Sequence, residues 1–152
     1  MKTTPLVVCL LTLMTIFSGC SGKEPAERGV RDGSLFPCPQ RPNCVSSMAD
    51  DSSHNIAPIV YQQSRQKALV DIKVVIGELD NAEIKEELSD YLWVECTSKL
   101  MGFVDDVEFF FPEEQKVIHV RSASRLGYSD MGVNRKRVEQ IRISFDRMQD
   151  NQ

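Results

Sequence analysis

Hydrophobic residues recur with a helical period in two stretches of the chain. In the first stretch they occupy positions 68, 69, 72, 75, 76 and 79, so they line one side of a helix. Ser64, just before this stretch, predicts the N-cap of that helix. In the second stretch Val138, Ile141 and Phe145 share one stripe, which predicts a final helix over residues 131–147.

Between these helices, hydrophobic and polar residues alternate, which is the pattern of half-buried β-strands. The alternation predicts strands over residues 82–88, 91–98, 104–111 and 116–122, and a short strand over residues 56–61 precedes the first helix. The order strand, helix, four strands, helix indicates an α+β fold. We expect an antiparallel sheet of four to five strands with two helices packed on one face.

The same alternation sorts the strand residues between the two faces of the sheet. The face that we expect under the helices holds Leu92, Val94, Cys96, Val107, Phe109, Phe111, Ile118 and Val120. The opposite face holds Tyr91, Trp93, Glu95, Thr97, Asp106, Glu108, Phe110, His119 and Arg121. This second face is either a solvated surface crossed by ion pairs or the floor of a binding site.

The hairpin around residues 111–116 has two admissible registers, because opposed residues must share a face. One register places Arg121 opposite Glu108, and the other places it opposite Asp106. Both predict a cross-strand ion pair. We expect His119 to be a surface histidine that pairs with Glu108.

Residues 1–19 have the pattern of an export signal. Lys2 precedes a mostly apolar stretch over residues 6–17, which is too short to cross a hydrocarbon core of roughly 30 Å as a helix. The sequence Phe17-Ser18-Gly19-Cys20 resembles the bacterial lipobox, although Phe17 departs from the usual Leu. We expect lipidation at Cys20, with an ordinary signal peptide and a free Cys20 thiol as the alternative.

A lipid at Cys20 implies an exported protein held on the periplasmic side of a membrane. Ser21 after the cysteine, in place of Asp, favours the outer over the inner membrane. The polar, glycine-containing residues 20–35 predict a flexible tether. We expect a single folded domain over residues 36–147 and a disordered tail over residues 148–152.

The charge of the chain argues against a nucleic-acid partner. Loss of Lys2 with the signal lowers Lys plus Arg from 18 to 17 against 22 Asp plus Glu, so the mature chain carries a net charge of −5. An acidic chain lacks the electrostatic footprint for nucleic acid. Basic residues gather in residues 121–147 and acidic residues in 78–114, which indicates that the two parts face each other or that one faces a ligand.

The segment PCPQRPNCVSSM, residues 37–48, carries two cysteines, for which we weighed a redox centre, a metal clip and a disulfide. Exported chains meet an oxidising environment in which thiols pair. With Cys20 lipidated and Cys96 in the core, Cys38 and Cys44 are left for each other, so we predict a disulfide. A zinc site with His54 is disfavoured, because zinc-binding cysteines are usually separated by about two to four residues.

The segment VRSASRLGYSDMGVNRKR, residues 120–137, leads into the final helix. The basic residues 135–137 oppose the helix dipole, and Asp130 as the predicted N-cap compensates them only in part. Full compensation requires internal ion pairs with Asp105 and Asp106, or an external anion. The candidate ligand-binding residues are Asp105, Asp106, Arg121, Ser122, Ser124, Arg125, Asp130, Asn134, Arg135 and Arg137.

The chain lacks a recognisable catalytic signature. His54 or His119 could join Ser122 or Ser124, but there is no Gly-x-Ser-x-Gly elbow to order them. We therefore predict no catalytic residue, no metal and no cofactor, and we favour a protein that is not an enzyme.

Three blocks, CPQRPNCVSS, GFVDDVEF and RSASRLGYSDMGVNRKR, occur in this order along the chain. They resemble the family catalogued as domain of unknown function family 1499, over about residues 35–145. The resemblance implies no activity. We expect a membrane-anchored envelope lipoprotein that binds an anionic or amphipathic ligand at its arginine-rich site; the alternatives are a scaffold that contacts another envelope protein and an enzyme of unrecognised type.

Overall fold

The two stretches of the chain with a helical period both form helices. In the computed structural model, which describes residues 22–151, α1 spans Arg65–Gly77 and α2 spans Val133–Asp150. The Ser64 side chain accepts a hydrogen bond from the backbone N–H of Lys67, so the predicted N-cap of α1 is confirmed. Neither of these helices is long and apolar enough to cross a bilayer.

The final helix begins and ends later than the predicted span of residues 131–147. Gly132 precedes it with a φ of 80°, a left-handed conformation that glycine adopts without strain. The last turn continues through Asp150, and the Gln149 side chain donates a hydrogen bond to the carbonyl of Val60. The prediction of a disordered tail is therefore wrong for residues 148–150, because they extend the helix.

The four strands predicted after α1 form an antiparallel meander. They are β5 Ala82–Glu87, β6 Tyr91–Thr97, β7 Val104–Phe110 and β8 Val117–Ser124. Two shorter strands, β3 Cys44–Ser46 and β4 Ile59–Val60, pair with opposite halves of β8.

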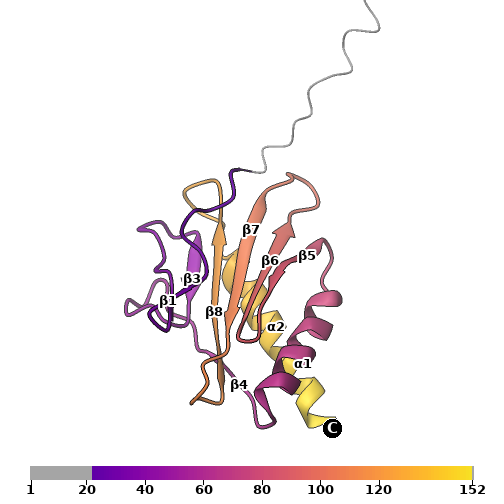
Figure 1. Ribbon diagram of the computed structural model, residues 1–152. Helices are drawn as coiled ribbons and strands as arrows, with labels where there is room; N and C mark the ends of the chain where they lie inside the picture. Colours follow the sequence, from indigo (N-terminus) through magenta and orange to yellow (C-terminus); the bar gives the residue numbers. More distant parts are fainter. Residues whose placement is uncertain (1–21, 152) are drawn as a thin grey trace, which may run out of the picture.

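The sheet order is β3-β8-β7-β6-β5, with β4 beside β8 (Figure 1). The predicted α+β fold with an antiparallel sheet is confirmed. Among the described residues this sheet has six strands rather than the predicted four to five. The missed strand β3 has three residues, all buried, so it shows no alternation of hydrophobic and polar positions.

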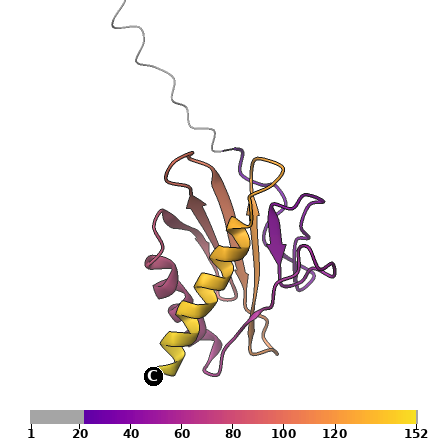
Figure 2. The ribbon, with the colours of Figure 1, turned by 180° about the vertical axis from the view of Figure 1, so that it is seen from behind.

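Both helices cover the same face of the sheet (Figures 1 and 2), and the core lies between them and the strands. Every hydrophobic residue predicted for this face is buried there, and none is more than 6% exposed. Phe109, Phe111 and Phe145 are fully buried, and each such side chain contributes about 1.5–3 kcal/mol to folding. Cys96 is a free, buried cysteine as predicted, and its burial raises the pKa of its thiol.

The other face of the sheet is covered by the N-terminal segment, residues 22–35. This segment forms a small hairpin of β1 Val30–Arg31 and β2 Ser34–Leu35. Asp32 and Gly33 join the two strands with φ values of 52° and 74°, a turn in which both central residues have positive φ. Leu35 then packs on the aromatic residues of the second face, which are Tyr91, Trp93 and Phe110.

This packing corrects two predictions. Residues 22–35 were expected to belong to a flexible tether, yet Leu35 is 5% exposed and the backbone N–H of Gly29 donates to Glu108 on β7. The second face was expected to be a solvated surface or an open binding floor, yet its aromatic residues are buried under this segment. The Asp-Gly pair of the hairpin was the available sequence signal, because this pair favours two-residue turns.

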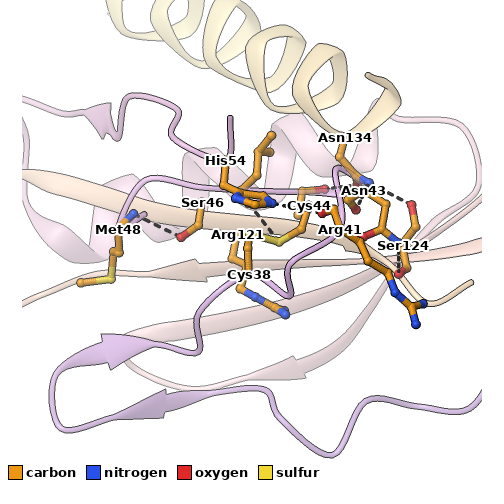
Figure 3. The surroundings of a disulfide bond; sticks show 12 residues. Cys38, Arg41, Asn43, Cys44, Ser46, Met48, His54, Arg121, Ser124 and Asn134 are labelled. Carbon is orange, nitrogen blue, oxygen red and sulfur yellow. Dashed lines mark hydrogen bonds between the residues drawn. A yellow bond between two sulfur atoms is a disulfide. The ribbon is translucent and has the colours of Figure 1, made fainter. Parts of the chain in front are cut away.

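Cys38 and Cys44 form the predicted disulfide, with 5.7 Å between their Cα atoms (Figure 3). Cys44 is the first residue of β3, and Cys38 lies three residues after β2. The bond therefore joins the end of the N-terminal segment to the edge of the main sheet.

The two histidines of the chain lie in contrasting environments. His119 is stacked against Phe110 and lies 3.1 Å from the Ser47 hydroxyl through its Nδ1. The predicted pairing of His119 with Glu108 is wrong, because the register sets His119 opposite Phe110 and Arg121 opposite Glu108. Burial lowers the pKa of His119, whereas hydrogen bonding to the Asp51 carboxylate raises the pKa of His54.

We predict that the two histidines titrate on opposite sides of the ordinary value of about 6.5. Because the pKa of His119 is lower in the folded than in the unfolded state, its contribution to stability is present above about 6.5 and lost as pH falls toward the folded pKa. The raised pKa of His54 gives the reverse dependence, lost as pH rises through its folded pKa. NMR titration of both rings, with His119→Gln and His54→Gln for assignment, measures the two values. Titration of both rings on the same side of 6.5 would contradict the prediction.

Candidate functional site

The predicted ligand-binding residues do not form one site. Consecutive strand residues point to opposite faces of a sheet, so Asp105 and Asp106 on β7 are separated by the sheet itself. The helix side holds Asp105, Ser122, Ser124, Asn134 and Arg137, and the side of the N-terminal segment holds Asp106, Arg121 and Arg125.

The group on the helix side is centred on Asn134, which is fully buried. Its side-chain oxygen accepts hydrogen bonds from Ser122 Oγ at 2.5 Å and Arg137 Nη1 at 2.7 Å. Its amide donates to Ser124 Oγ at 2.9 Å and to the carbonyl of Asn43 at 3.1 Å (Figure 3). The group therefore fastens α2 to β8 and to the residue before β3, which is a structural role.

The basic residues at the start of α2 are compensated from within the chain. Arg137 Nη2 lies 2.5 Å from Asp105, so the predicted internal ion pair with this carboxylate is confirmed. Arg135 instead donates to the carbonyls of Ser53 and Asn55 and takes no part in either group. The prediction of Asp130 as the N-cap of α2 is wrong, because the N-cap is Gly132. Asp130 accepts from the backbone N–H groups of Gly132 and Asn134, so its carboxylate still lies at the positive end of the helix dipole.

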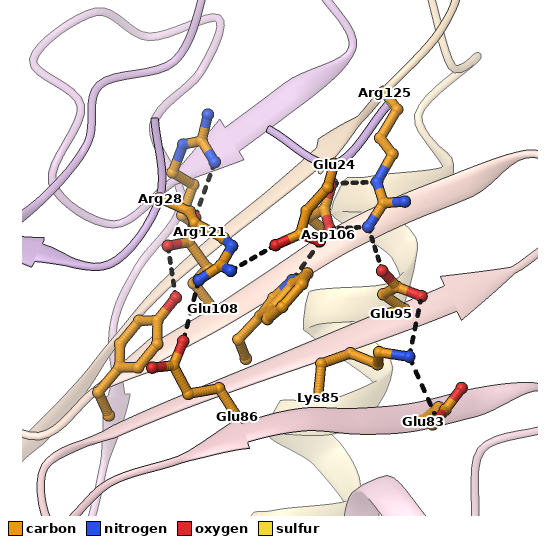
Figure 4. A network of polar contacts seen from close by, with 12 residues as sticks. Glu24, Arg28, Glu83, Lys85, Glu86, Glu95, Asp106, Glu108, Arg121 and Arg125 are labelled. Carbon is orange, nitrogen blue, oxygen red and sulfur yellow. Dashed lines mark hydrogen bonds and ion pairs between the residues drawn. The ribbon is translucent and has the colours of Figure 1, made fainter. Parts of the chain in front are cut away.

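The group under the N-terminal segment begins with Glu108, which is fully buried (Figure 4). Arg121 Nη1 donates to one carboxylate oxygen at 2.8 Å. Tyr91 Oη donates to the other at 2.9 Å, and so does the backbone N–H of Gly29 at 2.6 Å. Of the two predicted registers, the observed one is therefore Arg121 opposite Glu108. Burial, together with the Glu108 carboxylate, raises the pKa of Tyr91 far above its usual value.

A second buried carboxylate, Asp106, lies beside the first (Figure 4). It accepts from Trp93 Nε1 at 2.9 Å and from Arg125 Nε and Nη2, each at 2.8 Å. Arg125 also pairs with Glu95. Its hydrogen bonds to Asp106 and Glu95 raise the pKa of the Arg125 guanidinium.

Arg28 closes this network from the N-terminal segment. Its guanidinium carbon lies 3.8 Å from the centroid of the Trp93 ring, a cation–π contact, and its Nη1 is 2.9 Å from Glu86 on β5. Sequence analysis missed Arg28, because a single arginine in a polar, glycine-containing stretch carries no pattern.

A surface cavity of about 520 Å³ lies at the edge of this network, within the usual size range of small-molecule sites. Its walls come from the start of the N-terminal segment, from the disulfide loop and from the end of β8. Its lining includes Lys23, Pro25, Cys38, Pro39, Arg121 and Arg125.

Arg121 has unused hydrogen-bonding capacity in this cavity. Its side chain is 7% exposed, and its buried Nε has no acceptor among residues 22–151. A buried N–H without a partner is uncommon in folded proteins and requires an explanation. Arg125 donates through Nε and Nη2 only, which leaves Nη1 without an acceptor within the described residues.

The geometry at the histidines does not assemble a hydrolytic triad. His54 contacts both Ser53 and Asp51 through the same nitrogen, Nδ1, while its Nε2 faces the carbonyl of Arg41. A proton relay requires different ring nitrogens for the serine and the carboxylate. In the part of the chain that the structure describes, no group of three or more His, Cys, Asp or Glu residues is placed to hold a metal ion.

We predict that Arg125→Met destabilises the protein by about 3 kcal/mol, because it leaves the buried carboxylate of Asp106 without its charge partner. Urea unfolding followed by the fluorescence of Trp93 measures this loss. Arg135→Met is the matched control, since its guanidinium bonds only main-chain carbonyls near the surface, and we expect it to cost about 1 kcal/mol or less. Equal effects of the two substitutions would contradict the role of the ion-pair network.

Comparison with known proteins agrees with the three sequence blocks. A family model described as "Protein of unknown function (DUF1499)" matches residues 34–145, which covers most of the chain, the whole main sheet and most of α2. No curated protein and no solved structure matches the chain. The protein therefore belongs to the DUF1499 family.

Proposed function

We propose that this protein is an exported lipoprotein, acylated at Cys20, whose domain binds the anionic head group of an amphipathic molecule in the cavity at Arg121 and Arg125. The observation that carries the proposal is that Arg121 lines the cavity beside Arg125, while its buried Nε has no acceptor among the described residues. The signal pattern of residues 1–19 and the lipobox lie outside the described residues and support the anchor from sequence alone.

The free donors of these arginines fit a phosphate or carboxylate group. A guanidinium presents five N–H groups in a planar fork, which suits two-point recognition of oxyanions. Arg121 uses Nη1 for Glu108, and Arg125 uses Nε and Nη2 for Asp106, so each retains donors for a ligand. Lys23 adds a positive charge that has no ion pair within residues 22–151.

The charge balance of the cavity limits the ligand to a small anionic group. Asp106 and Glu27 also line it, but the charge of Asp106 is already compensated by Arg125. The remaining wall contains the small apolar side chains Ala26, Ala123 and three prolines, Pro25, Pro37 and Pro39. This combination of arginine donors and an apolar wall favours an amphipathic ligand over a highly charged one.

The alternative function is a scaffold that contacts another envelope protein through the same surface. Native mass spectrometry of the purified protein separates the two functions. A co-purifying small molecule supports ligand binding, and a bare mass together with a protein cross-linked to Lys23 supports the scaffold.

For the anchor, we predict that Cys20→Ser removes the protein from the membrane fraction and abolishes incorporation of labelled palmitate, because the thiol is the acylation site. Cell fractionation measures this loss, and separation of the two membranes of the cell tests the outer-membrane location. Cys96→Ser is the control, since this buried thiol lies in the core. Unchanged membrane association of the Cys20→Ser protein would contradict lipidation.

For the cavity, we predict that Lys23→Glu weakens binding of a short-chain phosphatidylglycerol about fivefold. A reversed charge at the rim of the site costs about 1 kcal/mol, which corresponds to this factor. Calorimetric titration of the Cys20→Ser protein, with the lipid kept below its micelle concentration, measures the affinity.

Lys136→Glu is the matched control, because Lys136 is exposed on α2 away from the cavity and we expect it to leave the affinity unchanged. Titration with inorganic phosphate shows whether the head group alone suffices, and the phosphatidylcholine analogue tests whether net negative charge is required. Absence of saturable binding of both anions, or an equal effect of the two lysine substitutions, would overturn the ligand site.

A further inference from the structure

The chain enters the fold within two residues of the proposed lipid anchor. The backbone of Gly22 lies against the loop between β8 and α2, since a Cβ built on it would be 2.9 Å from Arg125 Cβ and 3.1 Å from Leu126 Cγ. Position 20 precedes Gly22 by two residues, and two residues of chain reach at most about 7 Å. A lipid on Cys20 would therefore hold this end of the domain at the bilayer without a spacer.

Two loops at this same end carry unusually exposed apolar side chains. They are residues 98–103 between β6 and β7 and residues 125–132 between β8 and α2. The four most exposed large hydrophobic side chains of the described residues, at 61–92% exposure, all belong to these loops. The apolar residues concerned are Leu100, Met101, Phe103, Leu126, Tyr128 and Met131.

The two loops lie at the same end of the domain, where the described part of the chain begins (Figures 1 and 2). The backbone N–H of Arg125 donates to the carbonyl of Val104 at 3.1 Å, which ties the loop after β8 to the residue that follows Phe103. The hairpin between β7 and β8 and the end of α2 lie at the opposite end of the domain (Figure 1).

The charged side chains of these loops are already engaged. Lys99 pairs with Asp80 at 2.5 Å, Arg125 belongs to the buried network, and Asp130 accepts the backbone N–H of Asn134 at the start of α2. Contact with lipid would therefore bury apolar side chains without stripping water from an unpaired charge inside the loops.

From these observations we infer that the two loops form a membrane-docking surface, which inserts its apolar side chains into the lipid head-group region and fixes the orientation of the domain. The inference rests on the proposed lipid anchor. The occupant of this surface is the bilayer, because the acylated residue lies within about 7 Å of it along the chain. Side chains in such an interfacial position reach about 5–10 Å into the boundary between head groups and acyl chains.

Docking also sets the orientation of the cavity. Lys23 and Arg125 line the cavity and are the sequence neighbours of Gly22 and Leu126 at the docked end. The cavity then opens next to the lipid head groups, so a membrane lipid could reach Arg121 without crossing water.

The test measures the depth of the loops in a bilayer. Full-length protein carrying Leu100→Cys, Met131→Cys or Glu114→Cys is labelled at the new thiol with an environment-sensitive fluorophore. The labelled protein is reconstituted in vesicles of phosphatidylethanolamine and phosphatidylglycerol at about 3:1. Each vesicle sample is prepared with and without a nitroxide quencher on the acyl chains. Cys38 and Cys44 are joined and Cys96 is buried, so the introduced thiol is the accessible one among residues 22–151. Glu114 is the control, because it is exposed in the hairpin at the opposite end.

We expect the nitroxide to remove most of the emission from the labels at positions 100 and 131 and little from the label at 114. Flotation of the same vesicles reports on the anchor separately. Vesicles that carry the protein while all three labels escape quenching would overturn the docking surface and leave the lipid anchor standing. Failure of the wild-type protein to float would overturn both.

Discussion

Glu108 and Asp106 are two carboxylates buried in the middle of the sheet, and the rest of the structure must supply them with charged and hydrogen-bonding partners. An ionised carboxylate removed from water is costly unless charged and hydrogen-bonding partners surround it. Arg121 and Tyr91 supply part of this for Glu108, and Trp93 and Arg125 supply it for Asp106. The remaining donor to Glu108 is the backbone of residue 29, so the N-terminal segment must pack on the sheet to complete the network.

This requirement makes the N-terminal segment part of the domain. Arg28 stacks on Trp93, Leu35 closes the small aromatic cluster, and the disulfide then joins the chain to β3. The disulfide lowers the conformational entropy of the unfolded chain, and for so short a loop this stabilises the folded state by about 2 kcal/mol. A segment held at both ends cannot act as a spacer, which is why the proposed lipid at Cys20 would have consequences for the orientation of the whole domain.

The uneven distribution of charge along the sequence has a structural cause. The basic residues after position 120 lie on or next to β8 and α2. The acidic residues that they meet lie on β7, the strand beside β8. Arg121, Arg125 and Arg137 each meet a carboxylate of β7. The expectation that the two parts of the chain face each other is thus correct. Within the described residues, the buried Nε atoms of Arg121 and Arg28 remain without an acceptor after this compensation.

The sequence by itself determined the two helices, the meander of four strands and the residues of the main core, because periods of 3.6 and 2 are local consequences of burying one face. It also predicted the disulfide, from the compartment that the export signal led us to expect and from the few cysteines available. It could not decide which candidate residues meet. Alternation along β7 and β8 sends Asp105 and Ser122 to the helices but Asp106 and Arg121 to the other face, and only the register and packing of the sheet show which groups each face brings together. The fate of the N-terminal segment was also decided by tertiary structure, since its polar residues are held by partners about 60 to 80 positions away, such as Glu86 and Glu108, and no local pattern records such contacts.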